Sequence, residues 1–244
     1  MPKARYKLCE LFGIPIFIDF SFLLLLLIFI GDMHPFTFAV ASAMMLALSV
    51  VLHELGHSLV ARAFGYRTSD ITVSLLGGCA SLIALPRKAW QEFLTALAGP
   101  LVSFALAGIF HSMLVLLPIR NVWLISVLYY SFWMNIMLGG FNLLPGFPMD
   151  GGRIFRSTMR AFLSRSRATL VAMWVGRVFA VLLGLRGLHS ILFGGGWGFI
   201  SILIAWMIWR EGWREYQLSL VDERFDRWSQ DDFKAKVSPP PYES

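Results

Sequence analysis

Long apolar runs separated by short polar connections dominate the pattern of residues along the chain. A membrane-crossing helix needs about 20 mostly apolar residues. Six stretches meet or approach that length: residues 14–30, 36–64, 90–117, 121–144, 168–188 and 193–209. Pro145 and Pro148 stop the fourth stretch, because proline cannot continue a helix. The pattern therefore predicts about six transmembrane helices.

Residues 70–85, between the second and third stretches, follow a different pattern. Two apolar, partly β-branched runs flank Gly77 and Gly78, and such a connection predicts a β-hairpin. The hairpin is too short to cross a bilayer, so we expect it to be membrane-associated, beside the helices or at the membrane surface. The predicted fold class is an all-α polytopic membrane protein of about six transmembrane helices with this small β-hairpin.

The last part of the chain is charged, and this predicts a change of organisation. Residues 211–244 carry aromatic side chains among the charges and three consecutive prolines near the end. This pattern is typical of a cytoplasmic amphipathic segment followed by a disordered tail. We therefore expect a six-helix membrane domain at residues 1–210 and a separate segment at residues 211–244.

Composition and charge agree with a membrane protein. The 244 residues are 57% hydrophobic and 15% charged, and the mean hydropathy is +0.66, which excludes an ordinary soluble domain. Six spans place 18 of the 21 Lys and Arg residues on one side and only Arg120 and Arg186 on the other, with Arg177 inside the fifth stretch. Since basic residues favour the cytoplasm, both termini should be cytoplasmic, and the net charge of +6 needs no nucleic-acid partner.

One polar cluster interrupts the second stretch. Between residues 36 and 61, the only titratable residues are His53, Glu54 and His57, which form an H-E-x-x-H motif. Positions four apart on a helix differ by only about 40°, so both imidazoles project from one face and can share a metal ion. The carboxylate of Glu54 then lies beside the metal, where it can act as the base for a water molecule that the metal activates.

Such short motifs also arise by chance in soluble helices, so the membrane setting matters. Each ionisable residue near the bilayer centre costs on the order of 2.5 to 3.5 kcal/mol, and no Lys or Arg in the embedded part of this stretch can neutralise Glu54. Because no basic side chain offsets this cluster of three polar residues, a metal ion is the favoured counter-ion. We expect one Zn²⁺ per chain.

A third metal ligand is still needed, and four carboxylates are the candidates: Asp19, Asp70, Glu92 and Asp150. Asp150 is best placed, because Pro145 and Pro148 force irregular backbone near membrane depth, and such backbone is tolerated only beside protein or water. The alternative is that Asp150 caps a cytoplasmic helix or pairs with Arg153. A segment that unwinds after residue 144 could re-enter to the depth of His57, roughly 10 Å from the end of its helix.

These motifs resemble the site-2 protease family of intramembrane zinc metalloproteases. The resemblance covers about residues 8–185 and rests on these pieces: His53-Glu54-x-x-His57, Asn142-x-x-Pro145-x-x-Pro148-x-Asp150-Gly151, Gly13-Ile14-Pro15, Gly77-Gly78 and Ala98-Gly99-Pro100. It implies peptide-bond hydrolysis within a substrate's transmembrane segment. It further implies that His53, His57 and Asp150 bind zinc, that Glu54 is the base, and that Asn142 contacts the substrate backbone or the developing oxyanion. A hydrogen bond at the helix end is the alternative for Asn142.

The sequence also departs from this family. Many members carry an inserted PDZ domain or C-terminal CBS modules, and this sequence has neither, so it resembles a compact form. Ser103 stands where relatives often have Asn, which weakens any role assigned to that position.

The resemblance sets further expectations about partners and location. The expected partners are the lipid bilayer and a single-span membrane protein substrate, with membrane-tethered transcription regulators, sigma factors and anti-sigma factors as candidates. The expected location is a bacterial inner membrane. Two other functions stay open: a membrane zincin that cleaves soluble or lipidated peptides, with Glu92 as its third ligand, and a non-catalytic metal-binding scaffold.

Overall fold

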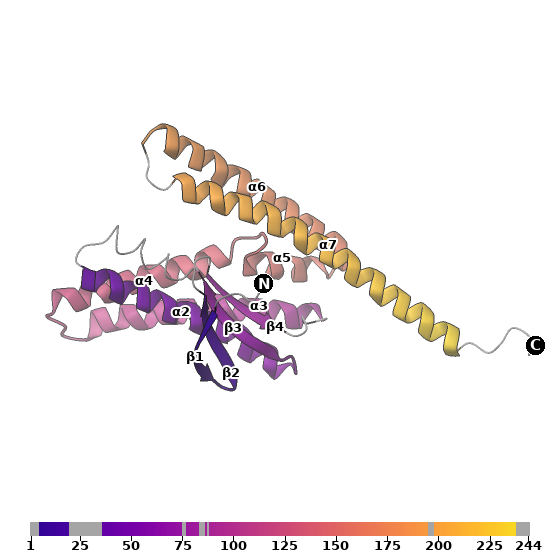
Figure 1. The fold of residues 1–244 in the computed structure, drawn as a ribbon, viewed down its shortest axis with the longest axis horizontal. Helices are drawn as coiled ribbons and strands as arrows, with labels where there is room; N and C mark the ends of the chain where they lie inside the picture. Colours follow the sequence, from indigo (N-terminus) through magenta and orange to yellow (C-terminus); the bar gives the residue numbers. More distant parts are fainter. Residues whose placement is uncertain are drawn as a thin grey trace, which may run out of the picture. The chain divides into compact units, whose positions relative to one another are not determined.

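The computed structural model describes residues 5–19, 36–74, 77–82, 86, 88–194 and 198–237. The chain forms two compact units, Met1–Leu144 and Pro145–Ser244. The first unit contains a small sheet and helices α2 to α4, and the second contains helices α5 to α7 (Figure 1).

The sheet of the first unit has four strands in the order β1-β2-β3-β4. They are β1 (Arg5–Leu11), β2 (Ile14–Asp19), β3 (Thr68–Ser74) and β4 (Gly77–Leu82). Phe12 and Gly13 connect β1 to antiparallel β2 with positive φ angles of 53° and 77°, as a type I′ hairpin turn requires. Strands β2 and β3 are parallel, and β3 and β4 are antiparallel.

The predicted hairpin is confirmed as β3 and β4, but it is only half of this sheet. The prediction that Gly77 and Gly78 form its connection was wrong, because both glycines lie in β4 and pair with β3. The fold is mostly helical, as predicted, but it is not all-α outside the hairpin. A membrane helix does not start at residue 14, because residues 14–19 form β2. The alternating Ile14 and Ile16 are buried in this strand, and β-branched side chains suit a pleated surface. The rest of the predicted first span, residues 20–30, lies outside the described residues.

Four described helices are long and apolar enough to cross a membrane. They are α2 (Phe36–Ala63), α3 (Ala89–Leu116), α4 (Val122–Asn142) and α6 (Arg165–Leu192), which correspond to the second through fifth predicted stretches. Helices form here because a backbone in lipid must satisfy its polar groups internally. The chain is an integral membrane protein, and six spans are not confirmed.

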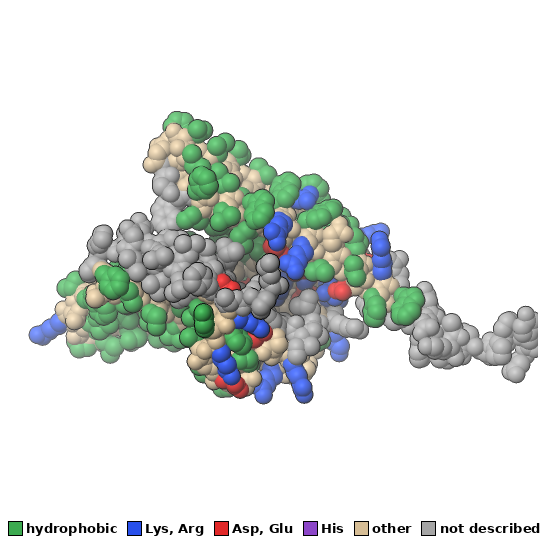
Figure 2. Space-filling view, viewed as in Figure 1, with side chains coloured by type: hydrophobic (Ala, Val, Ile, Leu, Met, Phe, Trp, Pro, Cys, Tyr) green, Lys and Arg blue, Asp and Glu red, His purple; other side chains and the backbone are tan. Residues whose placement is uncertain are grey.

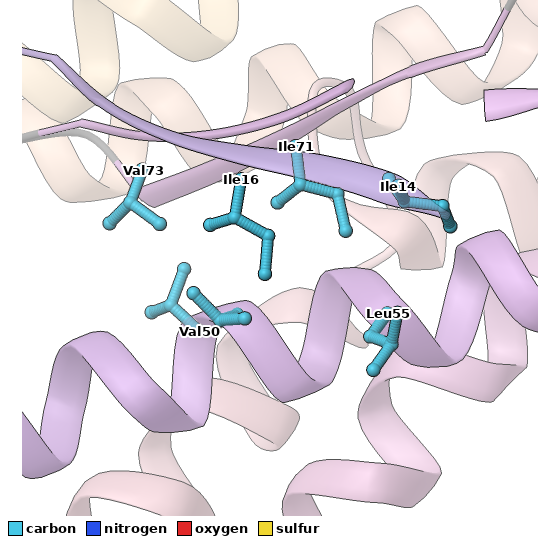
Figure 3. Packing of buried hydrophobic residues seen from close by; sticks show 7 residues of the cluster. Ile14, Ile16, Val50, Leu55, Ile71 and Val73 are labelled. Atoms are coloured by element: carbon cyan, nitrogen blue, oxygen red, sulfur yellow. The ribbon is translucent and has the colours of Figure 1, made fainter. Parts of the chain in front are cut away.

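The hydrophobic core of the first unit lies between the sheet and α2. Ile16 pairs in register with Ile71, and both are almost completely buried. Figure 3 shows these strand residues facing Val50 and Leu55 of α2. The sheet therefore packs on the same part of α2 that carries the H-E-x-x-H motif.

The second unit contains α5 (Asp150–Met159), α6 and the 40-residue helix α7 (Gly198–Val237). Helix α7 contains residues 198–209 of the sixth predicted stretch and continues through Arg210 without a break. The predicted domain boundary at residue 210 stays a prediction. Arg156 of α5 is buried, forms an ion pair with Glu215 of α7 at 3.1 Å, and lies over the ring of Phe147.

The packing of β2 on α2 predicts the effect of a core substitution. Ile16→Ala should lower the free energy of unfolding in detergent by about 2 to 5 kcal/mol, because it leaves a cavity between the sheet and α2. Tyr6→Ala is the control, because Tyr6 lies on β1 with 69% of its surface exposed, and it should change stability by about 0.5 kcal/mol at most. Equal losses for the two variants would contradict this assignment of the core.

Candidate metal centre

His53 and His57 lie one turn apart on α2 and form the centre of the candidate site. Their exposed fractions are 2% and 5%. The two Nε2 atoms are 3.2 Å apart. The motif thus brings two ring nitrogens to one point inside the first unit, as the sequence predicts.

Helix α3 holds the opposite nitrogen of each ring. The Nδ1 atom of His57 donates to the carbonyl oxygen of Thr95 at 2.7 Å. Because a carbonyl can only accept, this bond places a ring proton on Nδ1 and leaves Nε2 as the atom that could bind a metal ion. The Nδ1 atom of His53 lies 2.8 Å from the Ser103 hydroxyl. Each imidazole is therefore oriented from behind, as in metal-binding histidines.

The geometry of the two nitrogens fits zinc. Two nitrogen ligands at about 2.0 to 2.1 Å from a tetrahedral ion lie roughly 3.3 Å apart, close to the 3.2 Å between the Nε2 atoms. Gly99 of α3 leaves the space in front of them open. A Cβ atom at Gly99 would come within 2.6 Å of His53 Nε2 and still closer to His57 Nε2.

A second glycine allows α2 and α3 to approach each other. A Cβ atom at Gly56 would lie 2.8 Å from Val102 Cγ2 and 3.1 Å from the Ala98 carbonyl oxygen. Small residues at helix contacts permit this close packing in membranes. The approach is needed for a backbone carbonyl of one helix to reach a side chain of the other.

Three other residues singled out from the sequence also lie in the first unit, and each has its own surroundings. Glu54 is partly buried beside His53. Asn142 ends α4, and its Nδ2 donates to the Leu138 carbonyl at 2.9 Å, which is the helix-end bond considered as the alternative. Its predicted contact with substrate stays a prediction. Asp70 forms an ion pair with Arg5 of β1 at 3.3 Å, and so takes part in the sheet.

Asp150 begins α5 in the second unit and is 8% exposed. The preceding segment packs tightly, because a Cβ atom at Gly152 would lie 2.6 Å from the backbone of Gly146, and one at Gly146 would lie 2.6 Å from Gly176. Asp150 is the first residue of α5, as the alternative for this residue supposed, and a carboxylate is favourable in the first turn of a helix. Its pairing with the two histidines stays a prediction.

Sequence analysis missed the contribution of α3. Thr95, Gly99 and Ser103 are spaced four apart, so they form one small and polar stripe along an otherwise apolar helix. That spacing was a readable signal. Ser103 differs from the residue common in relatives, yet its hydroxyl contacts His53.

Fold and site together define a membrane protein with a buried histidine pair that could hold a metal ion, on a helix long and apolar enough to cross a membrane. The model of peptidase family M50 matches residues 41–122 and 117–184. The zinc metalloprotease MJ0392 of Methanocaldococcus jannaschii is 37% identical over 191 residues, covering 75% of this chain and 54% of that protein. The Synechocystis protein sll0528 is 33% identical over 253 residues, covering 94% of this chain and 64% of that protein.

A solved structure supports the same family assignment. The site-2 protease from Methanocaldococcus jannaschii matches with a TM-score of 0.65 and 32% identity, over 87% of this chain and 95% of that chain. The chain belongs to peptidase family M50, and the resemblance to site-2 proteases is confirmed. It spans 54% and 64% of the length of the two sequence relatives named above.

The open space at Gly99 makes a direct prediction. Gly99→Ala should abolish stoichiometric Zn²⁺ binding, because the new methyl group occupies the position in front of both Nε2 atoms. The control is Gly108→Ala, on the same helix with no atom within 4 Å of its Cβ position. Metal content of the purified proteins by mass spectrometry checks this. Full zinc occupancy in Gly99→Ala would contradict the location of the site.

The contact of Ser103 with His53 makes a second prediction. Ser103→Ala should weaken Zn²⁺ affinity by roughly 10- to 100-fold, because the His53 ring loses the group that orients it. Ser112→Ala, at an exposed position of the same helix, is the control and should leave the affinity unchanged. Competition with a chelator measures both affinities, and equal values would show that Ser103 does not position His53.

Proposed function

We propose that this chain is a zinc-dependent endopeptidase that hydrolyses a peptide bond within or near a transmembrane segment of a membrane protein. The observation that carries the proposal is the pair of Nε2 atoms, 3.2 Å apart, inside an apolar helix. Relatives named zinc metalloprotease and site-2 protease support it.

The proposed ligand set is His53, His57 and Asp150. Two neutral imidazoles leave the charge of a zinc ion uncompensated, and two histidines with one carboxylate are a common catalytic combination that keeps a fourth position open. The sequence that precedes Asp150 and the burial of its side chain support this role. When bound, the ion supplies Lewis acidity toward a water molecule and toward the scissile carbonyl.

The remaining steps belong to side chains of the chain itself. Glu54 is adjacent to a proposed ligand but is not itself one, so we assign its carboxylate the role of taking a proton from the attacking water and passing it to the leaving amine. Thr95 and Ser103 hold the two imidazoles in place during this transfer. Asn142 at the end of α4 would contact the substrate backbone with the part of its amide group not bonded to Leu138.

The membrane setting determines the form of the substrate. A helical segment in lipid has its backbone groups bonded internally, so it must unwind locally before a carbonyl can be attacked. The Lys and Arg distribution supports cytoplasmic termini and a cytoplasmic opening of the site. A single-span protein in a bacterial inner membrane is the substrate class that we propose, with membrane-tethered transcription regulators and sigma or anti-sigma factors as candidates.

This function predicts that two carboxylate substitutions behave differently. In liposomes with a single-span substrate, Glu54→Gln should retain zinc but cleave at least about 100-fold more slowly, because the base is lost. Asp150→Asn should lose both zinc and cleavage. Asp222→Asn is the control, since Asp222 is half exposed and pairs with Arg165, and it should keep both.

The same assay separates the alternatives. Wild-type protein that binds zinc but cleaves nothing would favour the metal-binding scaffold. Equal cleavage of a substrate peptide that lacks its transmembrane segment would favour a zincin acting on soluble peptides. Cleavage by Glu54→Gln at the wild-type rate would rule out the proposed base.

A further inference from the structure

Helices α6 and α7 form an antiparallel hairpin whose register follows from their contacts. Gly187 of α6 packs against Gly198 of α7, and Met173 packs against Gly212. Further along, the backbone N–H and hydroxyl of Ser166 both donate to the Glu223 carboxylate, at 2.7 and 2.8 Å. The two helices therefore run side by side from the turn between them to the start of α6.

This register divides the hairpin into an apolar part and a charged part. Between residues 178 and 209, Arg186 is the only residue with a permanent charge. Beyond Trp209, α7 carries charged residues beginning with Arg210 and Glu211, and α6 carries Arg165 and Arg167 at its start. Figure 2 shows hydrophobic side chains over the turn end of the hairpin at the upper left, and Lys and Arg side chains toward the other end. Arg177, opposite Trp209, lies at the boundary.

Three tryptophans surround Arg177 at this boundary. Its guanidinium carbon lies 4.8 Å from the Trp174 ring centre, 4.5 Å from that of Trp209 and 5.6 Å from that of Trp213. The three indoles are about half exposed. Tryptophans are enriched at the level of lipid headgroups. The cluster thus indicates that this arginine lies at the membrane surface and not within the hydrocarbon core.

The guanidinium of Arg177 lacks an acceptor among the residues that the structure describes. Stacking on aromatic rings engages its faces, whereas its five N–H groups point along its edge. Its Nε atom is buried without a hydrogen-bond partner. The neighbouring acids of α7 already serve other arginines: Glu211 contacts Arg210 and Arg214 at 3.6 and 3.5 Å, and Glu215 pairs with Arg156.

We propose that Arg177 and its three tryptophans bind the phosphate of a membrane phospholipid. A phosphate oxygen is an acceptor that a guanidinium edge recognises well, and it is abundant at headgroup level. The acyl chains would lie on apolar side chains that α6 exposes just beyond Arg177: Val178, Val181, Leu182 and Leu185. Phosphate chemistry alone would also suit a free phosphate ion, but the adjacent apolar surface favours a lipid.

The experiment is a titration of delipidated protein with phosphatidylglycerol, followed by native mass spectrometry. Arg177→Gln should weaken binding of the first lipid by roughly five- to tenfold, about the effect of one arginine near a membrane surface. Arg186→Gln is the matched control, because it removes the same charge from an exposed position on the same helix, and it should bind as wild type does. Equal affinity in Arg177→Gln and wild type would overturn the proposal.

Two further arms keep the test decisive. Trp213→Leu keeps the arginine but removes one ring, so it should weaken lipid binding even if Arg177→Gln fails to fold, and unchanged binding would overturn the proposal. Millimolar inorganic phosphate should not displace the lipid. Displacement would overturn the lipid assignment in favour of a soluble anion.

Discussion

The candidate metal centre depends on one hydrogen bond, from His57 Nδ1 to the carbonyl oxygen of Thr95. Because the carbonyl can only accept, the bond fixes the tautomer of the ring and also its direction. It can form only if α3 approaches α2 closely. Gly56 on α2 and Gly99 on α3 allow this approach, because neither has a side chain to hold the helices apart. Helix packing and ligand chemistry are therefore a single constraint, and a larger side chain at either glycine would disturb both.

The sheet stabilises the other side of the same helix. Val51 and Leu55 are two positions before and after His53, which places them roughly opposite it on α2. Both belong to the core formed with Ile16 and Ile71. A rotation of α2 that moved the histidines away from α3 would also pull these residues out of the sheet interface. Strands β2 and β3 thus help to orient the candidate site on α2.

The sequence predicted the features that follow from strong local patterns. The H-E-x-x-H motif and the long apolar stretches needed only helix periodicity and length. The two β-branched runs predicted the hairpin, although Gly77 and Gly78 belong to β4 and not to its connection. Strand β2 was missed because residues 14–30 are almost entirely apolar, with only Asp19 and Ser21 as polar residues, and a buried strand and a helix look alike in such a run. The roles of Thr95 and Ser103 depend on contacts between α2 and α3. The residues in contact are 38 positions apart for Thr95 and His57 and 50 positions apart for Ser103 and His53, and a local sequence pattern does not encode such contacts.

The charged half of α7 has a structural role in the second unit that its composition did not suggest. Arg156 follows Asp150 by less than two turns and is 1% exposed, and a buried charge is tolerated only when it is paired. Glu215 provides that pair from α7, while Phe147 covers the guanidinium face. This contact ties the helix that presents Asp150 to a residue beyond the last apolar stretch. The placement of the proposed third ligand therefore depends on the same segment that looks, by sequence alone, like a peripheral tail.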